Sequence, residues 1–325
     1  MARPDHRRRA RPRSLAPLVA AIALLAGCSH GSSDGAARPT TTSTSTTTTI
    51  PGPTVASTGA APRIQLRFAL HEGDEQTVAV TSDVSVAQEL STGDRLIDPP
   101  PVRQVISFRV GAVDATGADV TFEVTDAKVD AASGSISPAD ALLLDHDLVA
   151  LKGLSGSGHL LPSGRFTKVE VRLPASLDAL AKTEADSLSS QLGSLGPRLP
   201  DVAVGVGASW RTTDTTRVAG IDVVQRNVVT VTGIVGHVVT YRTTTVATAT
   251  NQRIRSSTLP AGTTAIVTSS RLTGTSTGTI DLGQPIGALR GGMAGTQRVR
   301  ISRGKGSSAD VAQRVDQRLT VGPIG

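Results

Sequence analysis

The chain has almost no cysteine and very few aromatic residues. Its 325 residues include one Cys, one Trp, one Tyr and four Phe. A single cysteine excludes a framework of intramolecular disulfides. Sugar-processing sites normally use aromatic platforms, so the shortage of rings argues against a carbohydrate site. Val, Leu and Ile are left to fill the core or to line a pocket, and an aliphatic pocket suits acyl chains better than rings.

The chain also lacks a basic field once its N-terminal segment is set aside. The formal net charge is +6, but residues 1–27 carry six of the 33 Lys and Arg and one of the 27 Asp and Glu. The remainder has 27 basic and 26 acidic residues. This balance argues against nucleic acid as a partner and predicts no polybasic patch for a membrane.

Signatures of catalysis and metal binding are missing as well. The one dense cluster of possible metal ligands is Asp145-His146-Asp147. On a strand, adjacent residues of this trio would point to opposite faces and could not converge on one metal ion. Gly274-Thr275-Ser276-Thr277-Gly278 matches the Gly-x-Ser-x-Gly nucleophile motif, but no helix pattern or histidine follows it. Gly304-Lys305-Gly306-Ser307 lacks the upstream glycine of a phosphate-binding loop. We therefore predict no catalytic residue, no metal site and no cofactor, while the ligand-binding residues stay unassigned.

The N-terminus has the features of a lipoprotein signal peptide in the required order. Five arginines lie between Arg7 and Arg13, and the stretch from Leu15 to Ala26 is almost wholly apolar. That stretch is too short to span a bilayer permanently. It ends in Leu25-Ala26-Gly27-Cys28, which resembles the lipobox of bacterial lipoproteins. The resemblance implies cleavage between Gly27 and Cys28, acylation of Cys28 and a location on the extracytoplasmic face of the cell membrane. A conventional secretory signal cut nearby is the alternative.

A stalk is expected to follow, over residues 28–63. This segment is mostly Ser, Thr, Gly, Pro and Ala, with an almost pure threonine tract from Thr40 to Thr49. It cannot bury enough apolar surface to offset its ordering entropy, so we predict a disordered tether. The threonine tract is either an acceptor for O-linked sugars or a bare spacer.

From Ile64 to the end, the pattern predicts one β-rich domain, residues 64–325. Apolar residues alternate with period two, as in Ile64, Leu66, Phe68 and Leu70, which is typical of strands with one buried face. Two such runs, Val105–Val113 and Val120–Val124, flank a turn-rich spacer and predict a hairpin. One long helix is expected at about 174–192, after Pro174 and before a glycine-rich stop.

The two halves of the domain resemble each other in motif order. Gly73-Asp74 and the first hairpin correspond to Gly207-Ala208 and to the runs Val228–Val231 and Val239–Tyr241. We predict pseudo-repeats over about 64–200 and 201–325. The expected fold is mainly β (α+β), a large curved antiparallel sheet or half-barrel built from two similar halves with one long helix. Convergent patterning of Val and Thr strands is the alternative explanation of the likeness.

The same motifs resemble an uncharacterised family of actinobacterial lipoprotein domains. The resemblance covers residues 64–325 and depends on Leu66-Arg67-Phe68, Gly73-Asp74, Leu199-Pro200 and the Gly-x-x-Trp entry at Gly207–Trp210. Ala208 stands where an acidic residue is expected. The family implies no activity. A more distant, fold-level likeness to LolA-like envelope lipoprotein carriers implies a curved sheet around a lipid-sized cavity.

These features predict a membrane-anchored extracytoplasmic lipoprotein that is not an enzyme. A cell-envelope scaffold or accessory protein is the first expectation, with an envelope protein as its partner. The alternatives are a carrier or binding protein for an apolar or acyl ligand, and a hydrolase with an unrecognised site.

Overall fold

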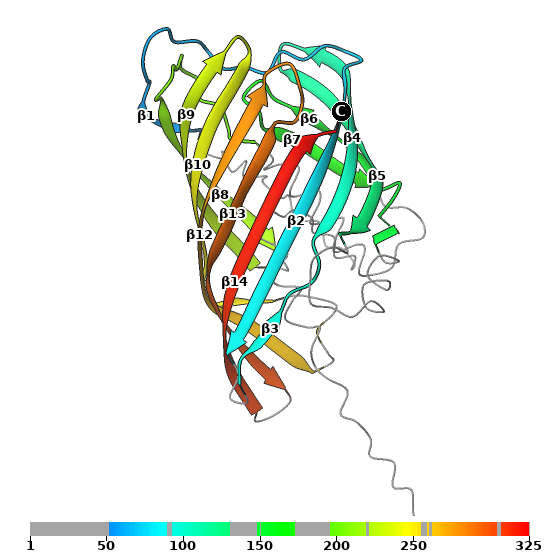
Figure 1. The fold of residues 1–325 in the computed structure, drawn as a ribbon, viewed down its shortest axis with the longest axis vertical. Helices are drawn as coiled ribbons and strands as arrows, with labels where there is room; N and C mark the ends of the chain where they lie inside the picture. The colour runs from blue at the N-terminus through cyan, green and yellow to red at the C-terminus, as the bar shows by residue number, and fades with distance from the viewer. Residues whose placement is uncertain are drawn as a thin grey trace, which may run out of the picture.

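The computed structural model confirms a mainly β protein. It describes residues 52–89, 93–130, 148–149, 151–172, 196–218, 221–254, 259, 262–303 and 307–324. The strands form one large open antiparallel sheet of 14 strands (Figure 1). The helix expected at about 174–192 lies outside the described residues, and no long helix is seen in the part that the structure describes.

The sheet has a single order with two short side strands. The main path is β1-β8-β9-β10-β12-β13-β14-β2-β4-β5-β6-β7, while β11 pairs with β12 and β3 pairs with β2. Figure 1 shows the long strands β12, β13, β14 and β2 side by side, with β9 and β10 on one flank and β4 and β5 on the other. The strands are β1 (Thr54–Ser57), β2 (Glu75–Glu89), β3 (Arg95–Ile97), β4 (Val102–Asp114), β5 (Gly117–Val129), β6 (Ser155–Leu160), β7 (Phe166–Arg172), β8 (Ser209–Val218), β9 (Ile221–Val235), β10 (Val238–Ala249), β11 (Gln252–Arg253), β12 (Thr263–Asp281), β13 (Ala288–Arg303) and β14 (Ser307–Pro323).

The period-two pattern gives the sheet one buried face and one exposed face. On β2, Val78, Val80, Val84 and Val86 are buried and alternate with less buried residues. The expected hairpin forms as β4 and β5, closed by the Asp114↔Gly117 pair. We call the buried side the inner face and the opposite side the outer face, since alternate side chains of a strand point to opposite sides.

The sheet begins earlier than the sequence suggests. The expected stalk extends to residue 63, but Thr54–Ser57 form β1, which pairs with the edge of β8. The amides of Ala60 and Ile64 donate to the carbonyls of Val206 and Val204 at 2.8 and 2.9 Å. Backbone pairing of this kind needs little apolar side-chain surface, so a polar, threonine-containing segment can still add an edge strand.

The core covers the inner face in clusters that are bridged by the segment after Ile64. Leu66 belongs to the cluster around Trp210 and Tyr241, and Leu70 belongs to the cluster around Phe108. Phe68 packs against both clusters. Its amide donates to the carbonyl of Pro162 at 3.0 Å. This segment therefore ties the first half of the sheet to the second.

The two predicted repeats enter the sheet by the same hydrogen bonds. Gly73 N donates to Val110 O, and Val110 N donates to Asp74 O. Gly207 N donates to Val231 O, and Val231 N donates to Ala208 O. Both glycines have a positive φ, of 90° and 82°, a conformation that glycine adopts without steric cost.

Each half also places an aromatic ring over a glycine of the next strand. Phe122 on β5 is paired with Gly156 on β6, and Tyr241 on β10 is paired with Gly278 on β12. A Cβ at either glycine would collide with the facing ring. Strand pairing therefore matches Gly156 of the first half with Gly278 of the second.

Candidate functional site

Most residues that the sequence singled out for chemistry lie outside the described part or play a structural role. Gly27, Cys28, Asp145-His146-Asp147 and Gly304–Gly306 are outside the described residues. Ser276 lies inside β12, opposite Thr243 on β10 and Gly291 on β13. A nucleophile elbow needs a sharp strand-to-helix turn. The glycine-rich motif around Ser276 is therefore a continuous strand and not a catalytic turn.

A hydroxyl, an imidazole and a carboxylate do meet beside the turn between β4 and β5. His159 Nδ1 lies 2.8 Å from Asp119 Oδ1, and His159 Nε2 lies 3.2 Å from Thr116 Oγ1. This is the order of a nucleophile, a base and an orienting acid. The Thr116 hydroxyl, however, donates to Asp114 Oδ1 at 2.6 Å. Its proton is directed away from the imidazole, so the hydroxyl of Thr116 stabilises the turn and is not activated as a nucleophile.

Asp114 is the acceptor at the centre of that turn. The hydroxyl and the backbone amide of Thr116, at 2.6 and 2.7 Å, and the amide of Gly117, at 3.2 Å, all donate to its Oδ1. The hydroxyl of Thr116 is the largest cause of a lowered pKa of Asp114, and the nearby imidazole of His159 adds to it. Hydrogen bonds to the charged carboxylate favour ionisation.

The other described histidines also face single carboxylates. His71 Nδ1 lies 3.6 Å from Asp74 Oδ2, and His237 Nε2 lies 3.4 Å from Asp281 Oδ1. Among the residues that the structure describes, no group of three or more His, Cys, Asp or Glu side chains could hold a metal ion. These pairs do not converge on a shared centre.

The inner face carries a feature that the sequence did not reveal, a row of three glutamines on adjacent strands. Gln313 on β14 lies directly opposite Gln88 on β2 and Gln297 on β13. Their exposed fractions are 3, 5 and 5 % respectively. Each lies two residues along its strand from a buried valine, Val86, Val315 or Val299, which places all three amides on the inner face. We call these three residues the glutamine row.

Several polar atoms of the inner face have no hydrogen-bond partner among the described residues. They are Nε2 of Gln88 and Gln313 in the row itself, Oε1 of Gln317 on the same strand as Gln313, and Oη of Tyr241, which lies in the separate cluster around Trp210. All four side chains point to the inner face by strand alternation. Burial raises the pKa of the Tyr241 hydroxyl well above its usual range, so this group is a neutral hydrogen-bond donor. A buried polar group without a partner costs about 1 to 3 kcal/mol, and such groups usually have a water, ion or ligand to satisfy them.

Apolar clusters lie on both sides of the glutamine row. Toward the upper part of the sheet lie Val84, Val86, Leu272 and Val315, which form one cluster. Toward the lower end lies a second cluster that includes Ile254, Ala265, Val267 and Val299. The inner face therefore has a band of amide groups between two aliphatic surfaces. Such an arrangement can hold a molecule with polar linkages between apolar parts.

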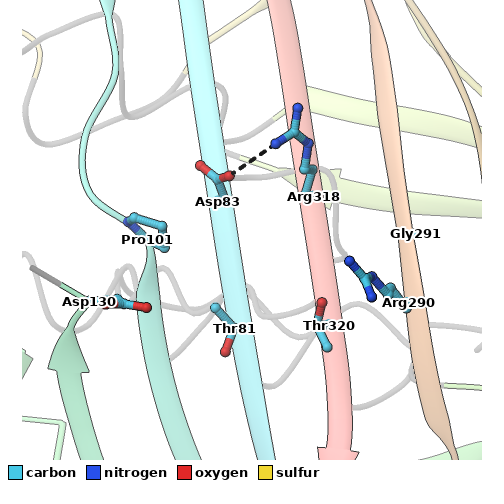
Figure 2. Close-up of a pocket in the computed structure, with 8 residues that line it drawn as sticks. All are labelled: Thr81, Asp83, Pro101, Asp130, Arg290, Gly291, Arg318 and Thr320. Atoms are coloured by element: carbon cyan, nitrogen blue, oxygen red, sulfur yellow. Dashed lines mark ion pairs between the residues drawn. The ribbon is translucent and has the colours of Figure 1, made fainter. Parts of the chain in front are cut away.

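The outer face has a separate polar hollow of about 330 Å³. Figure 2 shows its residues on one side of the sheet, with Arg318 directed toward Asp83. Arg318 Nη1 lies 3.8 Å from Asp83 Oδ2. The hollow is open and offers charges of both signs, and the protein residues around it are Thr81, Asp83, Pro101, Asp130, Arg290, Gly291, Arg318 and Thr320.

The described part contains no helix that is both long enough and apolar enough to cross a membrane. No protein-family model and no curated protein sequence matches this chain.

Proposed function

We propose that the chain is a lipid-anchored extracytoplasmic binding protein whose inner face holds an amphiphilic ligand. The anchor would be an acylated Cys28, supported by the lipobox-like order of the N-terminus. The observation that carries the binding function is the glutamine row, because the buried amide nitrogens of Gln88 and Gln313 lack partners among the described residues and lie between two aliphatic clusters. This combination suits a molecule with ester or phosphate oxygens next to acyl chains.

The available donors and acceptors suggest how such a ligand would be oriented. The amide nitrogens of Gln88 and Gln313 can each donate to a carbonyl or phosphate oxygen. Gln317 Oε1 can accept from a ligand hydroxyl. The acyl chains would pack on Val86, Val315 and the neighbouring aliphatic residues. Ligand binding would give these polar groups hydrogen-bond partners and so remove the free-energy cost of leaving them unpaired. Because the amides are already held in place in the free protein, the ligand would lose little affinity to ordering them.

We assign binding rather than catalysis. The group of Thr116, His159 and Asp119 stabilises the β4–β5 turn. The other described histidine–carboxylate pairs are separate from one another and from the glutamine row. Hydrolysis would need a nucleophile and a base converging beside the ligand. The residues around the row instead supply amides and aliphatic side chains.

A scaffold for an envelope protein is the second candidate, and exposed apolar residues at two hairpin tips favour it. Val113 beside the β4–β5 turn is 43 % exposed, and Val235 at the β9–β10 turn is 81 % exposed. The two hairpins are counterparts in the proposed repeats. Two equivalent apolar tips could contact one partner protein at a shared edge.

We also propose that the two halves, about 64–200 and 201–325, arose by duplication. Support comes from the matched glycine entries and from the matched ring-over-glycine contacts. Independent strands would share alternation, but they would have no reason to share the two positive-φ glycines and their hydrogen-bond pattern. We further propose that the two halves together curve the sheet into a half-barrel.

The ligand proposal is tested by native mass spectrometry of the mature chain, extracted gently from bacterial membranes, followed by organic extraction. We expect a co-purifying lipid. We also expect that Gln88→Met with Gln313→Met abolishes its retention, as well as the binding of the fluorescent fatty acid cis-parinaric acid. Thr296→Val, on the outer face beside Gln297, is the control. Equal lipid retention by both variants would contradict the site, and a chain that binds no lipid in any form would favour the scaffold.

A further inference from the structure

The overall charge balance conceals a strong separation of charge along the sheet. In the described residues of 196–324, Arg and Lys outnumber Asp and Glu by 13 to 6. In those of 64–172 they number 9 against 13. The net charge of the whole chain predicts no basic patch, because the excess of acidic residues in the first half offsets part of the excess of basic residues in the second. The half built from β8 to β14 is basic.

Six arginines of this half lie together on the outer face. Arg242 and Arg290 share one cross-strand row with Thr277 between them. Arg271 and Arg314 share a second row with Thr296 between them. All are exposed. We call the set the outer arginine face, and its members are Arg226, Arg242, Arg271, Arg290, Arg298 and Arg314.

The spacing of these arginines suits an extended anionic surface. Strands lie about 4.8 Å apart, so two arginines separated by one threonine strand lie roughly 10 Å apart. Arg298 is diagonal to both Arg271 and Arg314 on its neighbouring strands, at roughly 7 Å. The intervening threonine hydroxyls add hydrogen-bond donors. Figure 2 shows the upper end of the face, where Arg290 projects on the same side as Thr320.

These arginines lack the acidic partners that others on the same face have. Arg300 pairs with Asp310 at 2.9 Å, and Arg318 lies near Asp83 and Asp316. Among the described residues, no carboxylate lies within ion-pair distance of any member of the outer arginine face. Close cations without counter-charges repel one another, and an anionic partner would relieve that repulsion.

We propose that the outer arginine face binds the surface of an anionic phospholipid membrane. Charge complementarity favours a partner whose surface is rich in phosphate groups. The position of the anchor favours a membrane as that partner. The latter argument rests on the proposed acylation of Cys28. Residues 28–51 join that cysteine to the described chain, which enters at β1 on the edge of the basic half. The coil that the sequence predicts for this segment would span about 27 Å, so the anchor would keep the face within reach of the bilayer and raise its effective concentration.

The test uses the mature chain with Cys28→Ser, exported through a conventional signal peptide, so that no acyl group contributes. Its cosedimentation with phosphatidylcholine vesicles is compared with that on an equimolar mixture of phosphatidylcholine and phosphatidylglycerol. We expect binding to the anionic vesicles only, weakened by added salt. Each arginine near an anionic surface strengthens association about fivefold. Arg271→Gln, Arg298→Gln and Arg314→Gln together should therefore weaken it about a hundredfold.

A matched control removes the same charge elsewhere, through Lys152→Gln, Arg165→Gln and Arg172→Gln. It should retain anionic binding, whereas equal losses in both triple variants would show a mere net-charge effect and overturn the assignment. Equal binding to neutral and anionic vesicles would also overturn it. So would tight binding of soluble polyphosphate without vesicle binding, which would identify an anionic polymer as the partner. Because the chain is unacylated, failure of the anchor proposal leaves these outcomes unchanged.

Discussion

Replacing Gln313 with methionine should stabilise the chain when no ligand is bound. Gln313 Nε2 is buried with no hydrogen-bond partner in the described part of the chain, and the side chain is 3 % exposed. An unpaired buried donor costs about 1 to 3 kcal/mol. Methionine is unbranched and adapts to irregular surroundings, so it can fill the space without that cost. The free energy of unfolding should rise by about 1 to 3 kcal/mol for Gln313→Met and by a similar amount for Gln88→Met.

Gln76 provides a control on the same strand and the same face as Gln88. Its Nε2 donates to Ile286 O at 2.8 Å, and its Oε1 accepts from Ile286 N at 2.9 Å. Gln76→Met would leave both backbone groups of Ile286 without this partner. The free energy of unfolding should fall by about 1 to 3 kcal/mol. The same substitution therefore has opposite expected signs at two positions of β2.

The assay is urea unfolding of lipid-extracted chain, followed by the fluorescence of the single tryptophan, Trp210. A gain of 1 kcal/mol corresponds to roughly 2 to 4 °C in melting temperature for a domain of this size. Adding cis-parinaric acid should stabilise the natural chain and not Gln313→Met. If Gln313→Met and Gln76→Met lose equal stability, the amide of Gln313 is already satisfied, and the glutamine row is structural and not a ligand site.

Three other predictions address the anchor, the packing and the turn. Cys28→Ala should abolish incorporation of labelled palmitate, and undiminished labelling would refute the lipobox assignment. Gly156→Ala should lower the free energy of unfolding by about 1 to 3 kcal/mol, because its Cβ would meet the Phe122 ring, whereas Gly322→Ala meets nothing within 4 Å and should change little in the same urea assay. The pKa of Asp114 is lowered from 3.8 in the fold. Its ionised carboxylate therefore stabilises the β4–β5 turn above pH 3.8, and this stabilisation is lost as the pH falls through the folded-state pKa. The protection factor of the amides in the β4–β5 turn, which corrects exchange for its intrinsic pH dependence, should fall as the pH drops below 3.8, and Asp114→Asn should remove that dependence.

Strand alternation and turn chemistry allowed much of the sheet to be predicted from sequence. The β4–β5 hairpin was predicted because its two valine-rich runs flank an Asp and Gly turn, and the structure confirms it. The edge strand β1 was missed. Its residues, Thr54–Ser57, follow a polar tract, and the pairing partner that orders them is more than 150 residues away on β8. A local pattern carries no signal for such a partner.

The glutamine row could not be predicted from local sequence for the same reason. Gln297 and Gln313 face each other across one hairpin, but Gln88 joins them only through the pairing of β14 with β2. That pairing brings together the last strand of the second half and the first long strand of the first half. A glutamine at an inward position of an alternating strand was the one local signal, and it could equally mark an exposed edge.

The two proposed sites depend on the same strand register. On β14, Gln313 and Gln317 point inward with Val311 and Val315, while Arg314 and Arg318 point outward. A slip of one residue would move every side chain to the opposite face. It would bury two guanidinium groups and expose two valines, and burying an unpaired charge is far more costly than burying an amide. The outward arginines therefore help to fix the register that keeps the glutamines inside, so the proposed membrane-facing surface also stabilises the geometry of the proposed ligand site.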